Sequence, residues 1–299
     1  MFEELDQLLD DLVLRPFQAR MLDVLFHYTS WAGAESILRT RSFWATSHRD
    51  TDDPTELRAI DEVILGVVAA LRGRSSDAAL QVWDAFVTRF SETKVSSAFD
   101  VYITCFSATR DSSLHWTTYG GGGDGVCLGI SMLRDEELPA GDEPRFFTPI
   151  EYSAETWQRK IEASFSGIVG QFVRFVSGRH TSNDKTRALR ATLSALSRTA
   201  ALAEIAAKEQ HYSDECEWRS ALLSRKDSSL RRQHRDVRGR RIEYVETPAR
   251  SGDRAIVLTE IMLGPKNGPE AEHRAREMLT QVGYGSVGLA MPTIVRSAY

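Results

Sequence analysis

Two apolar runs enclose a segment rich in glycine and aromatic residues, and this arrangement constrains the fold more than any other part of the chain. Residues 101–106 and 126–130 have the β-branched and aromatic composition that is typical of strands. Between them lie Trp116, Tyr119 and four consecutive glycines at 120–123. Glycines let a backbone approach a ligand closely, and aromatic rings offer flat faces for stacking. The segment predicts a hairpin whose loop binds a ligand, or a hairpin whose aromatic residues only cover the core.

The composition is that of a globular chain. With 299 residues, of which 42% are hydrophobic, the chain can bury a large core, and its net charge of −5 is unlike that of a generic nucleic-acid binder. The first residues are acidic and amphipathic, unlike a signal peptide, and no apolar run approaches the ~20 residues of a membrane helix. The three cysteines, all in predicted strands, indicate buried thiols in a reducing compartment. We therefore expect a cytoplasmic protein without a membrane partner.

Periodicity and composition predict alternating helices and strands. The expected helices cover residues 4–14, 32–39, 54–71, 77–92, 154–176, 185–209 and 269–281. The expected strands cover residues 24–30, 43–45, 101–106, 126–130, 146–152, 216–223, 242–245 and 255–263. This order predicts a single α+β domain over residues 1–299, with a curved, mostly antiparallel sheet and flanking helices. Residues 154–209 are expected to be a helical insertion within that domain, packed against the sheet.

Two connecting segments have a distinctive composition. Asp53 and Glu56 flank a Pro-Thr pair and approximate a capping box at the start of the helix expected over residues 54–71. Residues 225–241 are basic and lack apolar periodicity, which predicts a mobile linker. This linker is either a solvated loop or a surface that holds a polyanionic acceptor.

A group of charged residues near the predicted strand at 216–223 is the main candidate for chemistry. Strand alternation would place Glu215, Glu217 and Arg219 on one face. Two neighbouring carboxylates suit general acid–base work or the stabilisation of positive charge. Alternatively, Glu217 forms an ion pair with Arg219 or Lys208 and has a structural role. No His and Asp spacing typical of a metal site is present, so no metal is expected.

Several short motifs, in the same order along nearly the whole chain, resemble those of a large bacterial protein family that is functionally uncharacterised. They are His27-Tyr28-Thr29-Ser30, Asp53-Pro54-Thr55-Glu56, Cys105-Phe106-Ser107, Trp116-Thr117-Thr118-Tyr119, Gly125-Val126-Cys127, Glu215 to Arg219, Gly264-Pro265, and Ser297 with Tyr299.

That family is in turn remotely similar to the ADP-ribosyltransferases, which share a His or Arg on the first strand, a Ser, Thr or Tyr in the middle and a late Glu. The similarity implies an ADP-ribosyltransferase-like fold and NAD as the substrate. It implies catalytic roles for Glu217, Glu215 and His27. NAD-binding positions implied by the same similarity are His27, Tyr28, Ser107, Arg110, Trp116 and Tyr119. The middle landmark is not a Ser-Thr-Ser sequence, which leaves the sub-class and the acceptor open.

The chemistry of NAD cleavage suits these residue types. Breaking the N-glycosidic bond builds positive charge on the ribose, and a carboxylate stabilises that charge. A neutral His27 can orient a ribose hydroxyl, an aromatic ring can stack on nicotinamide, and Arg110 or the glycine run can bind the pyrophosphate. Taken singly, His27 also fits a structural histidine, and Trp116 and Tyr119 fit core aromatics.

Two functions therefore remain in view. The first is an NAD-dependent ADP-ribosyltransferase or NAD glycohydrolase, as a toxin or phage-defence effector that modifies a protein or nucleic acid and has a cognate neutralising partner. The second is a non-catalytic module that binds nucleotides or nucleic acid.

Overall fold

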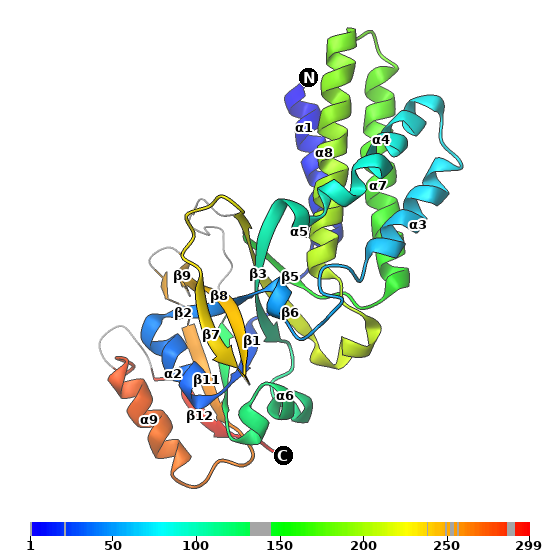
Figure 1. Cartoon of the computed structure of the whole chain (residues 1–299). Coiled ribbons are helices and arrows are strands. Elements are labelled where there is room, and N and C mark those ends of the chain that lie inside the picture. The colour runs from blue at the N-terminus through cyan, green and yellow to red at the C-terminus, as the bar shows by residue number, and fades with distance from the viewer. Residues whose placement is uncertain are drawn as a thin grey trace.

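Two lobes make up the structure, a large sheet with flanking helices and a bundle of long helices (Figure 1). The computed structural model describes residues 2–20, 22–131, 145–237, 239–248, 250–251, 254–255, 257–285 and 291–299. The chain begins beside the bundle and ends near α6, at the edge of the sheet lobe.

The α-helices are α1 (Phe2–Leu14), α2 (Trp31–Thr40), α3 (Asp61–Arg72), α4 (Asp77–Thr93), α5 (Val95–Ala98), α6 (Ser113–Thr118), α7 (Ala154–Val176), α8 (Ser182–Ala206) and α9 (Ala271–Gln281). Short 3₁₀ turns are η1 (Arg15–Phe17), η2 (His48–Asp50), η3 (Gly121–Gly123) and η4 (Gln210–Glu215). The strands are β1 (Val24–Thr29), β2 (Ser42–Ser47), β3 (Phe99–Ser107), β4 (Val126–Ser131), β5 (Arg145–Pro149), β6 (Glu217–Arg225), β7 (Gln233–Val237), β8 (Arg240–Pro248), β9 (Arg250–Ser251), β10 (Arg254–Ala255), β11 (Val257–Leu263) and β12 (Thr293–Arg296).

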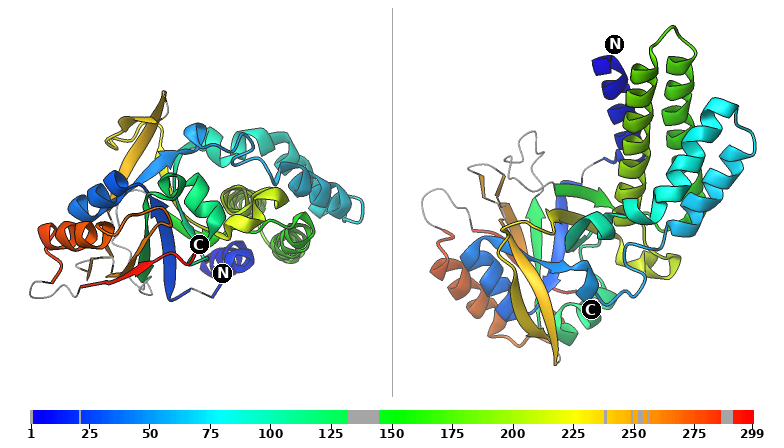
Figure 2. Two further views of the ribbon diagram at one scale, coloured as in Figure 1. Left: turned by 90° about the horizontal axis from the view of Figure 1, so that it is seen from below. Right: turned by 45° about the horizontal axis from the view of Figure 1, so that its top comes forward.

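The main sheet has ten strands, and its longest path runs β12-β11-β4-β1-β3-β2-β8-β7. The pairings among the described strands are antiparallel, apart from the parallel pair of β11 and β12. Helices α2 and α9 lie side by side against one face of this sheet (Figure 2), where they share a hydrophobic core with β1, β4 and β11. The predicted α+β class with a mostly antiparallel sheet is confirmed.

Strand β3 is the centre of the sheet. One of its edges pairs with β6 over its whole length, and the other pairs with β2 in the middle and with β1 at a single position, Phe26 opposite Ser107. Both strands predicted around the glycine run are present as β3 and β4, but they do not form a hairpin. Strand β1 lies between them, because it also pairs with β4 over six residues. The intervening segment, which contains α6 and η3, spans the width of β1.

The helical bundle is larger than the insertion predicted from the sequence. Helices α7 and α8 pack with α1, α3 and α4 around a core of their own. Its centre contains Trp83, Phe86 and Phe165, each almost completely buried. The bundle therefore collects helices from separate parts of the chain, because each has an apolar face that the sheet does not cover.

The helix expected to begin at residue 54 starts seven residues later, at Asp61. Leu57 has a φ of 62°, in the left-handed region, so the backbone cannot continue a helix through it. Asp53 caps only a local turn, in which it accepts hydrogen bonds from the amide and hydroxyl of Thr55 at 2.7 and 2.6 Å. The capping box is not formed, and the Glu56 side chain accepts hydrogen bonds from Arg219 instead.

The basic stretch at 225–241 is not a linker. Strand β6 continues to Arg225, and β7 pairs with β8 in a hairpin. Arg235 fixes this hairpin to β2, because its guanidinium lies 5.2 Å from the centre of the Trp44 ring and donates to the Thr46 hydroxyl at 3.1 Å. Residue 238, which belongs to the same stretch, lies outside the described residues.

None of the described helices combines the length and the apolar character that crossing a bilayer would take.

One carboxyl group is buried where the bundle meets the sheet lobe. Glu204, on α8, is 1% exposed, and its Oε2 accepts a hydrogen bond from the Val95 amide at 2.9 Å. Its Oε1 and the Oδ1 of Asp61 are buried and have no hydrogen-bond partner among the described residues. Burial, assisted by the charge of Asp61, raises the pKa of Glu204 from its ordinary value of 4.5 to about 8.

This shift predicts a pH-dependent stability that Glu204→Gln removes. Between pH 4.5 and about 8, the folded protein keeps a proton on Glu204 that the unfolded chain has released. The free energy of unfolding therefore falls as the pH rises through this range, and Glu204 causes no further change above it. Gln keeps an acceptor for Val95 and cannot ionise. We therefore compare the difference in melting temperature, variant minus unsubstituted protein, at two pH values. We expect this difference to be more positive at pH 8.5 than at pH 5. Thermal unfolding at both pH values measures this, with the exposed Glu272→Gln as a control, and a pH-independent difference would contradict it.

Candidate functional site

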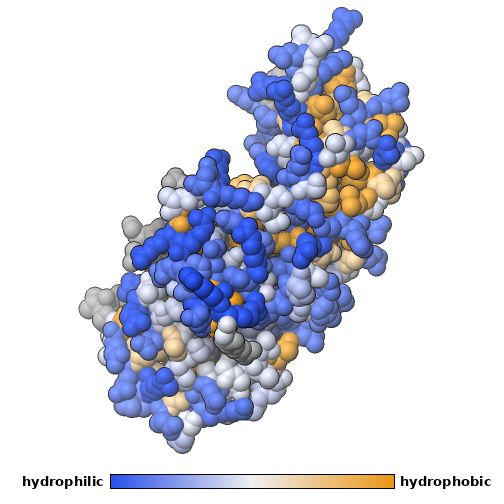
Figure 3. Space-filling model, in the orientation of Figure 1, coloured by the Kyte–Doolittle hydropathy of each residue, from blue (hydrophilic) through white to orange (hydrophobic). Residues whose placement is uncertain are grey.

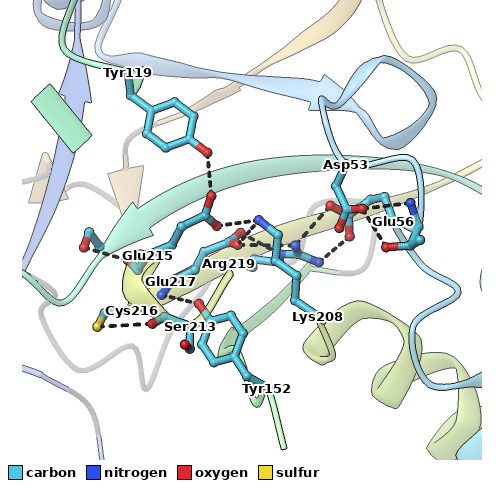
Figure 4. A network of polar contacts seen from close by, with 12 residues as sticks. Asp53, Glu56, Tyr119, Tyr152, Lys208, Ser213, Glu215, Cys216, Glu217 and Arg219 are labelled. Carbon is cyan, nitrogen blue, oxygen red and sulfur yellow. Dashed lines mark hydrogen bonds and ion pairs between the residues drawn. The ribbon is translucent and has the colours of Figure 1, made fainter. Parts of the chain in front are cut away.

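Five charged side chains are buried together at the start of β6 (Figure 4). We call them the charged cluster: Glu56, Lys208, Glu215, Glu217 and Arg219. Each is at most 9% exposed. They come from three places in the chain, the loop before α3, the segment after α8, and the junction of η4 with β6.

Arg219 lies at the centre of the charged cluster and is completely buried. Its Nε donates to Glu217 Oε1 at 2.6 Å, and its two terminal nitrogens donate to the two oxygens of Glu56 at 2.5 and 3.0 Å. One of these nitrogens also donates to the Ile205 carbonyl at 3.0 Å. The guanidinium therefore ties β6 to the loop before α3 and to the end of α8.

Lys208 connects the two glutamates that the sequence singles out. Its Nζ donates to Glu215 Oε2 at 2.5 Å and to Glu217 Oε2 at 3.1 Å. Tyr119 donates its hydroxyl to the other oxygen of Glu215 at 2.7 Å. The ion pair that the sequence suggests for Glu217, with Arg219 or Lys208, is present with both partners.

The backbone between the two glutamates differs from the predicted strand. Cys216 has a φ of 45°, so Glu215 ends η4 and Glu217 begins β6. Simple strand alternation does not apply at Glu215, and Cys216 is exposed and outside the sheet. The junction is held by Ser107, whose hydroxyl donates to the Glu215 carbonyl at 2.9 Å, and by Tyr152, whose hydroxyl accepts from the Glu217 amide at 2.9 Å.

The cations determine the ionisation of the charged cluster. Burial alone would raise the pKa of Glu217, but the adjacent Arg219 and Lys208 outweigh it and hold that pKa at about 2. Burial raises the pKa of Glu56 despite its pairing with Arg219. Although burial opposes it, the charges of Glu217 and Glu215 raise the pKa of Lys208. Three carboxylates and two cations give the charged cluster a formal charge of −1.

A series of aromatic rings leads from the core to Glu215. The Tyr28 ring stacks on His115 with centres 4.8 Å apart and meets the edge of Trp116 at 4.9 Å. His115 in turn lies 5.9 Å from Tyr119, which is 44% exposed, whereas Tyr28 and Trp116 are buried. Burial lowers the pKa of His115, so its imidazole is neutral at pH 7. The series thus connects Tyr28 and Trp116, through His115, with Tyr119, and Tyr119 is the member that contacts Glu215.

Asp111 fixes the inner end of this series. Its carboxylate accepts a hydrogen bond from the Trp116 indole at 2.6 Å, from the Ser297 hydroxyl at 3.0 Å and from the Ala298 amide at 2.8 Å. The glycine run comes shortly after α6. Gly121, Gly122 and Gly123 all have positive φ angles, so this turn requires glycine.

Two predicted site residues have other partners. Arg110 forms a bidentate ion pair with Glu260, with both distances 2.9 Å. His27 places its Nδ1 2.9 Å from the Cys105 carbonyl, and its ring contacts Phe43 and Phe106. Among the described residues, neither side chain forms a hydrogen bond or an ion pair with Glu217.

The strand register explains the position of His27. Phe26, not His27, pairs with Ser107, and Ser107 pairs with Glu217. Directly paired residues point to the same face of a sheet, and successive residues alternate. The side chain of Phe26 is therefore on the Glu217 face, and His27 leans toward the face of Phe106.

Cys105 is exposed, whereas we expected it to be buried. It lies opposite Arg219 in the pairing of β3 with β6, on the face of the charged cluster. The surrounding protein, together with the Glu217 charge, raises the pKa of its thiol well above the ordinary value.

Sequence reasoning did not assign Glu56, Tyr152 or His115 to a site. The sequence predicts a helix-capping role for Glu56, although the Asp-Pro-Thr-Glu motif that contains it contributes to the family resemblance. Glu56 and Arg219 are 163 residues apart in the sequence, so no local pattern predicts their contact.

Comparison with known proteins identifies one segment. Residues 115–220 match a family described as a protein of unknown function (DUF2971). The matched range covers roughly a third of the chain and includes the Trp116–Tyr119 and Glu215–Arg219 motifs. Neither the curated proteins nor the solved structures contain a match.

Removing the central cation is expected to be strongly destabilising. Arg219→Gln leaves Glu56 and Glu217 buried without their main partner, and breaking such a pair costs roughly 3–5 kcal/mol in the free energy of unfolding. Arg72→Gln is the control, because Arg72 and Asp84 form a pair at 2.8 Å that is more than half exposed; this substitution should cost under about 1 kcal/mol. Urea denaturation measures both, and equal effects would show that the charged cluster is not critical to stability.

Cys105 provides a direct report on the charge of Glu217. Glu217→Gln removes a negative charge that raises the thiol pKa and leaves Lys208 and Arg219, which lower it. We expect alkylation of Cys105 by iodoacetamide to be faster in this variant at pH 8. Mass spectrometry measures the rate at Cys105, with the exposed Glu272→Gln on α9 as the control variant. An unchanged rate at Cys105 would contradict the electrostatic coupling.

Proposed function

We propose that the protein cleaves the bond between nicotinamide and ribose in NAD⁺ and passes the ADP-ribosyl group to an acceptor or to water. The observation that carries this proposal is the carboxylate pair of Glu215 and Glu217, held together by Lys208 beside the exposed ring of Tyr119. A site that binds only anions gains nothing from two adjacent carboxylates, whereas a site that stabilises a ribosyl cation requires negative charge.

The reaction balances with the groups that are present. The C1′–N bond breaks, and its electron pair leaves with nicotinamide. A hydroxyl of the acceptor, or water, forms the new bond at C1′ and gives its proton to the carboxylate of Glu215 or to solvent. As the bond breaks, positive charge moves from the nicotinamide ring to the ribose, and the formal charge of −1 on the charged cluster stabilises it there in the transition state.

The contacts suggest different roles for the two glutamates. Glu217 is 4% exposed and accepts hydrogen bonds from both Arg219 and Lys208, so it acts as a fixed charge behind the reaction centre. Glu215 accepts a hydrogen bond from the exposed Tyr119, and we assign to it the contact with the acceptor. The Tyr119 ring is accessible for stacking on nicotinamide, and His115, which stacks on the buried Tyr28, lies beside it.

One observation favours a second candidate. Each oxygen of both carboxylates already accepts a hydrogen bond, as a structural clamp requires, and the chain would then be a non-catalytic nucleotide-binding module. The two candidates differ in whether nicotinamide is released.

The test is the release of nicotinamide from NAD⁺ by the purified protein, measured by chromatography. Glu217→Gln and Glu215→Gln each keep the size of the side chain and remove its charge. Electrostatic groups of this kind contribute on the order of 10²–10³ in rate, so we expect losses of that size with little change in NAD⁺ affinity. Glu272→Gln, an exposed substitution on α9, should leave the rate unchanged.

Melting temperature is measured on the same samples, so that lost activity is compared only among folded proteins. A folded Glu217→Gln variant with full activity would refute the proposed role. Saturable NAD⁺ binding without release of nicotinamide by the unsubstituted protein would replace the enzyme with the binding module.

A further inference from the structure

The helical bundle contains a cavity that belongs to neither the charged cluster nor the aromatic series. Its volume is about 260 Å³, and it opens between α4 and α8. Phe86 of α4 and Leu193 of α8 provide its apolar lining. Hydrophobic residues at the surface of the bundle, bordered by hydrophilic ones, are visible in Figure 3.

Four polar side chains complete the lining: Arg89, Arg190, Ser194 and Ser197. Three of them follow one face of α8 at positions i, i+4 and i+7, and Arg89 approaches from α4. The cavity thus has cationic groups contributed by two helices, with hydroxyl groups beside them.

These four side chains make no hydrogen bond or ion pair with any other described residue. Their neighbours on α8 behave differently. Arg198 pairs with Asp10 at 2.7 Å, and the hydroxyls of Thr192 and Thr199 donate to carbonyls one turn earlier at 2.8 and 3.0 Å. The hydrogen-bonding capacity that lines the cavity is therefore available to a ligand.

The positive charge of the cavity indicates that its ligand is an anion. No acidic side chain is present among the described residues that line it, so two guanidinium groups face one space without a counter-charge. A bound anion would reduce their mutual repulsion and accept charge-assisted hydrogen bonds. The apolar lining at the same time favours a hydrocarbon portion.

We infer that this cavity binds a small organic anion, a phosphate monoester or carboxylate attached to a short aromatic or branched apolar group. The volume lies just below the usual range of about 300–1,000 Å³ for ligand pockets, so the ligand is smaller than a dinucleotide. This inference is independent of the function proposed for the charged cluster.

Phenyl phosphate is the probe, with benzoate as the carboxylate and phenol as the uncharged comparison. Isothermal titration of the full chain should give saturable binding of phenyl phosphate or benzoate and much weaker binding of phenol. Arg89→Gln and Arg190→Gln should each weaken binding by roughly tenfold or more, the effect expected from losing a charged hydrogen bond. Arg198→Gln is the matched control, because Arg198 lies on the same helix and does not line the cavity.

The outcomes are distinguishable. Binding that Arg198→Gln weakens as much as Arg190→Gln would indicate general attraction to a basic helix and overturn the site. Phenol binding as tight as phenyl phosphate would reduce the cavity to an apolar patch. The absence of saturation at millimolar concentrations would also refute the inference. All three variants alter exposed side chains, and their melting temperatures confirm folding before titration.

Discussion

The buried guanidinium of Arg219 is the interaction on which the end of the sheet depends. Removing an arginine from water is costly, and only well-placed carboxylates and carbonyls offset the cost. Glu56, Glu217 and the Ile205 carbonyl supply these partners from a loop, a strand and a helix. Because each partner comes from a different part of the chain, the charged cluster cannot form until the loop, β6 and the end of α8 are all in place. The charged cluster is therefore expected to form only in the fully folded protein.

The same contacts limit what the carboxylates can do. Glu217 remains ionised at every physiological pH because two cations hold it, but those cations also cancel much of its field. The charged cluster has three carboxylates and two cations, so a net charge of −1 is available to stabilise a developing positive charge. Glu215 has fewer cationic partners than Glu217, since Lys208 and the neutral Tyr119 are its side-chain contacts. Within the proposed mechanism, these contacts favour Glu215 for direct contact with the acceptor and leave a supporting role to Glu217, the residue that the family resemblance made central.

Local patterns predicted much of the fold and part of the site. The apolar runs predicted β3, β4 and β6, and the nearness of Lys208 and Arg219 predicted the pairing of Glu217. Three features were beyond local reasoning. The insertion of β1 between β3 and β4 is decided by tertiary pairing. The positive φ of Leu57 interrupts a sequence with helical periodicity. The contact of Glu56 with Arg219 requires the whole fold, so the sequence alone could suggest a motif but not its partner.

Helix α8 connects the proposed anion cavity with the charged cluster, which raises the question of coupling between them. The cavity lies along the middle of α8, while Ile205 is in its last turn and Lys208 follows just after its end. Coupling requires two positions of α8 that a ligand distinguishes by affinity. Yet the buried face of α8 carries Ala195, Ala200 and Ala203, all at most 1% exposed, and such close packing resists sliding of the helix. An anion between α4 and α8 therefore meets a helix that is already fixed, and the two sites are expected to act independently.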